Sequence, residues 1–172
     1  MRPFWSKAVG AMLAQGDFLP ECHVPEFGEG FGRQGGEEEL AVRETDLIVV
    51  TQSCDLENEK VPLVALCPIH SLDAFEEANP TYKGKGRWES VRQGRVAGLH
   101  MLASPEAPND NRAALIVDFG QIHSLPPAYV KRRATELGAR WRLESPFLEH
   151  FSQALARYFM RVGLPSSIPA FK

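Results

Sequence analysis

The sequence predicts an α+β domain in which a small, strongly curved antiparallel β-sheet or partly open β-barrel is packed by a C-terminal helix. Two observations support this prediction. Strand-like runs follow one another through the middle of the chain, and the best-defined amphipathic helix lies at its end. A parallel α/β sheet is the alternative, but parallel strands need long crossover connections, and long helices between the strands are scarce.

The composition predicts one globular domain spanning residues 1–172. Hydrophobic residues make up 44% and charged residues 24% of the chain, which excludes a disordered or collagen-like protein. Three cysteines are too few, and odd in number, for a disulfide framework, so we expect a cytoplasmic location. No apolar run approaches the roughly 18 residues of a membrane span, so we expect no membrane partner.

The first 45 residues predict a short helix and a flap. Apolar residues recur at three- and four-residue steps over 4–13, which is typical of an amphipathic helix. From about 20 to 45 the chain is rich in glycine, proline and glutamate, which predicts a flexible acidic loop.

Two apolar runs predict strands in the core. Residues 47–51 form a continuous, largely β-branched run, which is typical of a strand buried on both faces. Residues 61–69 form the second run, and Pro62 and Pro68 near its ends favour an edge position.

Shorter elements are expected between these runs and the C-terminal helix. Ser71 is a good N-cap for a helix that ends at about Ala78. Residues 87–93 predict a further helical turn. Strand-like patterns cover 95–103, 113–125 and 140–143.

The C-terminal helix is the most clearly marked element. Ser145 is a good N-cap, Pro146 suits the first helical position, and Gly163 with Pro165 ends the helix. Its apolar face comprises Phe147, Leu148, Phe151, Leu155, Tyr158, Phe159 and Val162. We therefore expect this helix to dock on the sheet.

The net charge of −3 conceals an asymmetry between the halves of the chain. Residues 1–81 contain 5 basic and 15 acidic side chains, whereas residues 82–172 contain 14 basic and 7 acidic ones. Such an asymmetry indicates an interaction surface. The alternative is that the two halves fold together and neutralise each other.

The sharpest candidate site is the polar segment Thr51-Gln52-Ser53-Cys54-Asp55. It follows the most buried strand, which would hold its side chains on a rigid platform. Cys54 would act as a nucleophile if a neighbouring base or positive charge favoured its thiolate. Asp55 beside it opposes the thiolate unless it orients a histidine instead. Alternatively, Cys54 is a small core residue, Asp55 opens a turn and Gln52 bonds to the backbone.

Cys54 also belongs to a weak zinc pattern. Cys67 and His70 have C-x-x-H spacing, and Cys22 could join them from the flap. Structural zinc needs about four sulfur or nitrogen ligands in tetrahedral geometry, and only one closely spaced pair is present. The alternative places Cys67 in the core and His70 on a solvated turn.

Arginines around an aromatic residue indicate a binding face for an anionic partner. Arg140, Trp141 and Arg142 are consecutive, and Arg157 and Arg161 lie four residues apart on the C-terminal helix. This pattern suits phosphate contacts with base stacking, as in a nucleotide or single-stranded nucleic acid. Alternatively, the helix arginines complement the helix dipole, or they pair with the acidic half.

Histidines supply candidate proton acceptors. His100 and His123 fall on predicted strands, and His150 lies in the first turns of the C-terminal helix. Any of the three could act as a base towards a neighbouring group. The alternative is a purely structural role.

Two segments resemble those of a group of uncharacterised small bacterial proteins, namely TQSCDL at 51–56 and SPFLEHFSQALARYFMRVGLP at 145–165. Those proteins resemble this chain in a Q-x-C-D element after a buried strand and in a terminal helix ending in R-V-G-L-P. The resemblance implies no activity. A distant similarity to the small β-barrels of growth-inhibiting ribonuclease toxins is an analogy of fold alone.

These patterns favour a binding or regulatory module, with a polar site at Gln52–Asp55 and an arginine-rich face for nucleic acid, a nucleotide or a protein partner. The first alternative is a small hydrolase, such as a ribonuclease-like toxin, that uses Cys54 or Asp55 with a histidine and an arginine. The second alternative is a structural protein stabilised by zinc.

Overall fold

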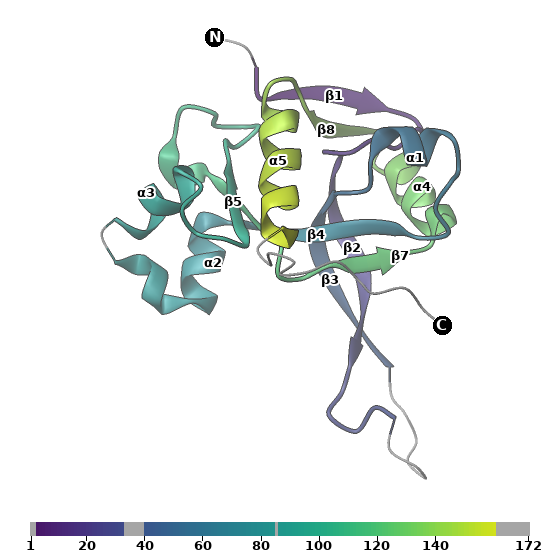
Figure 1. The fold of residues 1–172 in the computed structure, drawn as a ribbon. Coiled ribbons are helices and arrows are strands. Elements are labelled where there is room, and N and C mark those ends of the chain that lie inside the picture. Colours follow the sequence, from purple (N-terminus) through teal and green to yellow (C-terminus); the bar gives the residue numbers. More distant parts are fainter. Residues whose placement is uncertain (1–2, 33–39, 85, 161–172) are drawn as a thin grey trace, which may run out of the picture.

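The protein is an α+β structure built on a six-stranded antiparallel sheet (Figure 1). The computed structural model describes residues 3–32, 40–84 and 86–160. Five strands pair in the order β2, β3, β4, β6, β5, and the sixth, β7, pairs with β4. Their bounds are Phe18–Phe27 (β2), Leu40–Val49 (β3), Val64–Ser71 (β4), Leu99–Leu102 (β5), Leu115–Asp118 (β6) and His123–Leu125 (β7). The predicted α+β class with antiparallel strands is confirmed.

Five α-helices connect and cover these strands. They are α1 (Ser53–Glu57), α2 (Leu72–Ala78), α3 (Arg87–Arg92), α4 (Pro127–Glu136) and α5 (Phe147–Phe159), and two 3-10 turns span Pro80–Lys83 and Asn111–Ala113. As predicted, Ser71 caps α2, because its Oγ accepts a hydrogen bond from the amide of Ala74 at 3.2 Å.

Two details of the helices differ from the sequence predictions. The helix α4 was not predicted from the sequence, although Pro127 is in its first turn and the buried residues Val130 and Ala134 lie about one helical turn apart. In α5, Pro146 occupies the N-cap position and no side chain caps the helix, so the prediction of Ser145 as N-cap is wrong. The predicted end of that helix, Gly163 and Pro165, lies outside the described residues.

The strands β1 (Trp5–Val9) and β8 (Ala139–Leu143) form a separate antiparallel pair, with Trp5 opposite Leu143. The predicted strand at 140–143 is confirmed, but the predicted helix over 4–13 is wrong. Its short apolar pattern is compatible with either structure, and the partner strand that decides between them lies near the far end of the sequence. The larger sheet does not close on itself, so the described strands do not form the predicted barrel.

A long hairpin of β2 and β3 projects from the body of the molecule (Figure 1). The flexible acidic loop predicted at about 20–45 is therefore wrong for residues 20–27 and 40–45, which lie in β2 and β3, whereas residues 28–32 lie outside the strands and 33–39 lie outside the described residues. Pro25 is tolerated because β2 is an edge strand. Phe27 lies opposite Leu40, and both side chains are exposed. Pairing across the hairpin thus overrides a composition that favours a loop.

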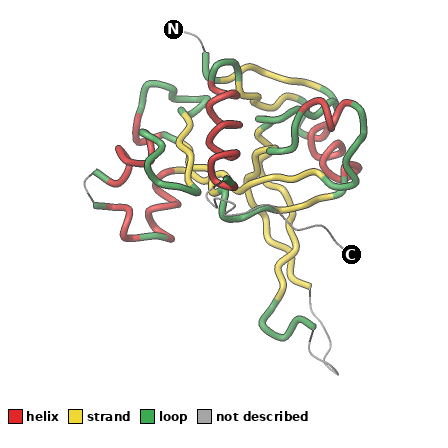
Figure 2. The backbone as a smooth tube through the Cα atoms, in the orientation of Figure 1, coloured by secondary structure: helices red, strands yellow, loops and turns green. Residues whose placement is uncertain are grey.

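Side chains of β3 alternate between two hydrophobic cores. Leu47 and Val49 pack in the core that contains Val130 of α4, whereas Ile48 packs in the core that contains Phe151 of α5. Because the side chains of residues 47–49 point alternately into the two cores, this part of the strand is apolar throughout, as predicted for a strand buried on both faces. Figure 2 shows the resulting arrangement, in which helices flank the sheet on different sides.

The strand β4 lies inside the sheet, so the predicted edge position is wrong. One edge of β4 pairs with β3. The other edge pairs with β7 at 64–66 and with β6 at 69–71. Pro68, which has no N–H to donate, lies in the gap between these two partners. A proline is therefore accommodated in a central strand without the loss of a ladder hydrogen bond on that edge.

Candidate functional site

The polar segment after β3 faces two different cavities. Gln52, Ser53 and Cys54 line an open groove against α5, which we call the α1–α5 groove. Asp55 lines a separate cavity beside α4. Because these residues form the short helix α1, successive side chains point in different directions. The structure thus brings together three of the four residues predicted to form one site.

A buried glutamine, Gln15, connects the segments that form the α1–α5 groove through hydrogen bonds. The Gln15 side chain donates from Nε2 to the carbonyl of Val50 and accepts at Oε1 from the Ser152 hydroxyl, at 3.0 and 2.9 Å. Its backbone amide donates to Ser53 Oγ at 3.0 Å. These bonds connect the end of β3, the start of α1 and the middle of α5. Sequence reasoning missed Gln15, because its partners come from three distant segments.

Cys54 is exposed at the surface of α1. In the part of the chain that the structure describes, Asp55 is the one side chain within hydrogen-bond distance of the thiol, and Sγ lies 3.9 Å from Oδ1. The alternative that Cys54 lies in the core is wrong because the side chain is exposed, and no histidine or cation lies within hydrogen-bond distance of the thiol among the described residues.

The predicted arginine-rich face is only partly on the surface, because Arg140 is buried while Trp141 and Arg142 are partly exposed. Arg140 and Arg142 both contact the carboxylate of Asp17, with Arg140 Nε 2.8 Å from Oδ2 and Arg142 Nε 2.5 Å from Oδ1. The side chains of Arg140 and Asp17 are fully buried. Arg140 also donates to the carbonyls of Gly10 and Met12. We call Asp17, Arg140 and Arg142 the Asp17 cluster, and it ties the 10–17 loop to β8.

The remaining residues predicted for this face have separate surroundings. Between the two arginines, Trp141 carries the ammonium of Lys7 over its ring, 3.5 Å from the centroid. Arg157 is exposed on α5. Arg161 lies outside the described residues. The predicted binding residues therefore do not form one continuous patch.

Acidic residues of the first half neutralise much of the basic second half. The pairs include Lys131 with Glu59, Arg133 with Glu21, and Arg112 with Asp73 and Glu76, in addition to the Asp17 cluster. This is the second of the two interpretations that the charge asymmetry allowed. Among the described residues, Arg157 has no carboxylate partner; its Nε is 3.4 Å from the backbone carbonyl of Gln153.

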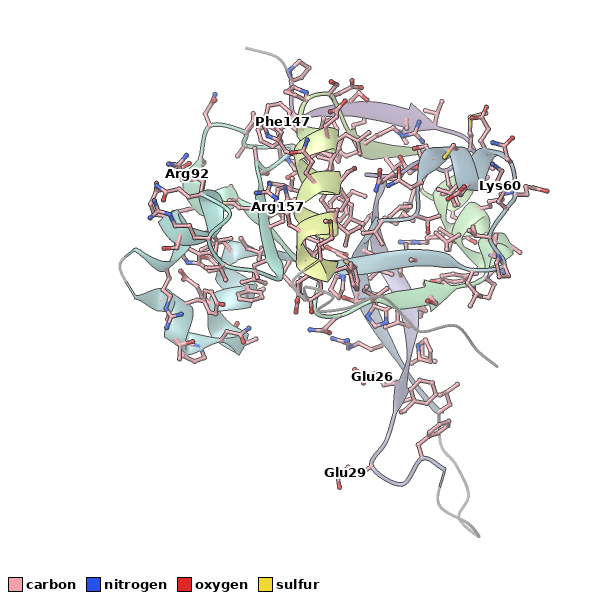
Figure 3. All side chains as sticks on the ribbon, viewed as in Figure 1. Glu26, Glu29, Lys60, Arg92, Phe147 and Arg157 are labelled. Atoms are coloured by element: carbon pink, nitrogen blue, oxygen red, sulfur yellow. The ribbon has the colours of Figure 1, made fainter. Side chains whose placement is uncertain are left out.

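Arg157 lines a cavity of about 310 Å³ between α5 and the segment from α3 to β5, which we call the α5 pocket. His100, His150 and Gln153 contribute further polar groups. Figure 3 shows Arg157 on the flank of α5 that faces α3, the helix that carries Arg92. The Arg92 guanidinium contacts Glu89 at 2.6 Å, so it is already paired. The pocket lining contains no carboxylate.

His100 is held between aromatic rings at the base of the α5 pocket. Its ring is stacked on Phe119 and lies edge-on to Phe151, with centroids 6.0 and 5.8 Å apart. Burial, together with the nearby His150 and Arg157, lowers the pKa of His100 to about 4. The imidazole is therefore neutral at pH 7 and can accept a proton or a hydrogen bond.

The other predicted histidines lie elsewhere. His123 pairs with Leu66 in the sheet, and its Nε2 atom is buried without a hydrogen-bond partner among the described residues. Burial and the nearby Arg43 lower the pKa of His123. Burial likewise lowers the pKa of His70, which lines a shallow pocket with Asp46. The structure thus brings His100 together with His150 but not with His123.

The residues of the zinc pattern are separated. Cys22 packs in the core beside α4 and Cys67 in the core beside α5, on opposite faces of the sheet. Burial raises the pKa of Cys22 to about 11 and that of Cys67 to about 12, which disfavours the thiolates that zinc requires. Within residues 3–32, 40–84 and 86–160, no three histidine, cysteine or acidic residues are grouped as metal ligands would be. Binding of zinc remains an untested prediction.

In the described ranges, no helix combines the length and the apolar composition that crossing a bilayer requires. The chain matches no protein family model and no curated protein.

Proposed function

We propose that this chain is a binding module for a phosphate-bearing ligand, a nucleotide or single-stranded nucleic acid, whose phosphate enters the α5 pocket. The observation that carries this proposal is a pocket that holds two imidazoles and the Arg157 guanidinium, which has no carboxylate partner among the described residues, and whose lining contains no carboxylate. A phosphate brings one or two negative charges and several acceptor oxygens. Arginine matches that geometry with paired N–H donors, which makes such contacts strong.

The surroundings of Arg157 favour an anion further. Phe119 and Ala154 contribute apolar walls, which strengthen electrostatic attraction by lowering the local dielectric constant. The volume of about 310 Å³ is at the lower end of the range for small-molecule sites, so it suits a phosphate with part of its sugar. Gln153 lines both this pocket and the α1–α5 groove. A longer ligand would therefore extend from the α5 pocket towards Gln52 and Ser53.

Binding of a short fluorescein-labelled single-stranded RNA, followed by fluorescence anisotropy at low salt, tests the proposal. We expect measurable binding that weakens steeply as salt increases, because phosphate contacts release counterions. The variant Arg157→Gln should weaken binding about tenfold. It should also lower the slope of the logarithm of the binding constant against the logarithm of the salt concentration by about one, because one phosphate contact is lost. The same titrations with inorganic phosphate and with a nucleoside monophosphate distinguish a nucleotide from a polynucleotide.

Arg132→Gln is the matched control. Arg132 is an exposed arginine on α4 that does not line the α5 pocket. It lies over the ring of Tyr129, 5.4 Å from the centroid, and makes a long contact of 3.7 Å with Glu136. This variant should bind RNA as the unaltered protein does. Absence of binding at low salt to all three probes would disprove the proposal, and an equal loss in both variants would show that binding depends on overall charge rather than on the pocket.

Cleavage of a phosphodiester is the second candidate function, favoured by the neutral imidazole of His100 in the same pocket as a guanidinium. A neutral imidazole can take the proton of the ribose 2′-hydroxyl as its oxygen attacks phosphorus and the bond from phosphorus to the 5′-oxygen breaks. The resulting imidazolium can return that proton to the leaving 5′-oxygen, while Arg157 stabilises the negative charge on the phosphoryl oxygens. Incubation of RNA with the protein in excess chelator tests this function. His100→Asn should retain RNA binding and lose cleavage. If RNA stays intact after prolonged incubation with the unaltered protein, cleavage is excluded and only the binding function is supported.

A further inference from the structure

A second cavity, of about 530 Å³, lies on the other side of α1 from the α1–α5 groove, and we call it the α1 cavity. Its walls come from the 11–13 loop, from α1 with the turn that follows it, and from the start of α4. The lining is mainly apolar and includes Met12, Leu13, Val61, Pro62 and Pro127. Its volume is within the range that binds small molecules, and apolar walls are typical of such sites.

The charged groups of the α1 cavity are predominantly acidic. Asp55, Glu57 and Glu59 contribute carboxylates, and Lys131 is the single basic residue of the lining. The ammonium of Lys131 lies 2.9 Å from Glu59, so these two charges neutralise each other. Neither Asp55 nor Glu57 has a cationic partner among the described residues. The cavity thus carries two uncompensated carboxylates beside an apolar wall.

We propose that the α1 cavity is a binding site for a small organic cation, a primary ammonium compound with an apolar body. The apolar body would displace water from the wall formed by Leu13 and Val61, which supplies the hydrophobic contribution to binding. The ammonium would bind a carboxylate of the cavity lining through charge-assisted hydrogen bonds, and Asp55 and Glu57, two positions apart on α1, offer separate positions for it. An anion of the same shape would meet two uncompensated negative charges.

The site is independent of the proposed function. It shares no lining residue with the α5 pocket and has the opposite charge. Met12, which is 71% exposed at the cavity, adds a flexible and polarizable side chain that adapts to ligands of different shape. The proposal also gives Asp55 a role, because this residue of the polar segment faces away from Gln52 and Ser53.

Titration of the isotope-labelled protein with three probes of similar shape tests the charge preference. The probes are phenethylammonium, the neutral phenethyl alcohol and the anion 3-phenylpropanoate, and binding is read from amide chemical shifts in NMR spectra. We expect shifts at residues 11–13 and 55–62, with the ammonium compound binding at least threefold more tightly than the alcohol and the anion binding least. Equal affinity of the first two probes would overturn the assignment to a cation.

Variants locate the charge and close the cavity. Asp55→Asn and Glu57→Gln should each weaken ammonium binding roughly two- to fivefold, as expected for partly exposed ion pairs. Lys131→Met, which frees Glu59, should strengthen it. Glu77→Gln, an exposed carboxylate on α2, is the matched control and should have no effect.

Ala11→Trp places a large ring at an exposed position of the lining and should abolish binding. Shifts with a lysine-containing peptide but none with phenethylammonium would reassign the cavity to a protein partner.

Discussion

The carboxylate of Asp17 lies 2.8 Å from Nε of Arg140, and both side chains are fully buried. Arg142 completes the cluster from the same strand. A buried ion pair adds little net stability, but removal of one partner leaves the other charge without compensation. We therefore expect Asp17→Asn to lower the free energy of unfolding by about 3–5 kcal/mol, measured by urea denaturation.

The control for this prediction is an exposed ion pair. Asp73 contacts Arg112, and both side chains are more than half exposed. Asp73→Asn should cost less than about 1 kcal/mol, because solvent screens the charges. Similar losses in the two variants would contradict a special role for the buried pair.

Gly98 is expected to be indispensable for the shape of the α5 pocket. Its φ is +93°, and a Cβ atom there would lie 3.1 Å from Cε2 of Tyr158. Gly98→Ala therefore combines backbone strain with overpacking. Gly94, whose φ is +67° with no atom within 4 Å of an added Cβ, provides the control for strain alone. We expect Gly94→Ala to cost about 1–2 kcal/mol and Gly98→Ala about 1 kcal/mol more, both by urea denaturation.

His100 should make stability depend on pH. Its pKa falls from the ordinary 6.5 to about 4 on folding, so the unfolded chain binds more protons than the folded protein between these values. The free energy of unfolding therefore rises with pH across this window. His100 contributes up to about 3 kcal/mol to this rise, which is complete above pH 6.5. Unfolding of the unaltered protein and of His100→Phe, compared at several pH values, measures it. A difference between the two proteins that stays constant from pH 7 to about pH 4 would argue against this pKa.

The three cysteines should differ sharply in reactivity. Cys54 is exposed, whereas burial raises the pKa of both Cys22 and Cys67 well above the ordinary thiol value. Iodoacetamide should therefore modify the folded protein once, at Cys54, and the denatured protein three times. Mass spectrometry of peptides locates the label. Rapid modification of Cys67 in the folded state would show that the core beside α5 opens.

Local signals predicted those elements whose evidence is contained within a few residues. The N-cap Ser71, the buried run around Ile48 and the amphipathic pattern before Phe159 each specify their element without a distant partner. The sequence also indicated the polar segment after the buried strand, His100 and Arg157 as candidate site residues. Their grouping was not, because the α5 pocket joins residues from β5 and α5 that no spacing connects.

The sequence by itself determined the α+β class, the buried central strand, the C-terminal helix and the opposite charges of the two halves. Pairing between distant segments decided the rest. β1 is a strand because β8 lies beside it, and the acidic flap is largely a hairpin because β2 and β3 exchange backbone hydrogen bonds. Several basic side chains of the second half pair with acidic residues of the first half, whereas Arg157 has no carboxylate partner among the described residues. Burial of a charge such as Arg140 requires a partner, here Asp17. Beneath the net charge of −3 lie a buried ion pair and two cavities with linings of opposite charge, acidic for the α1 cavity and basic for the α5 pocket.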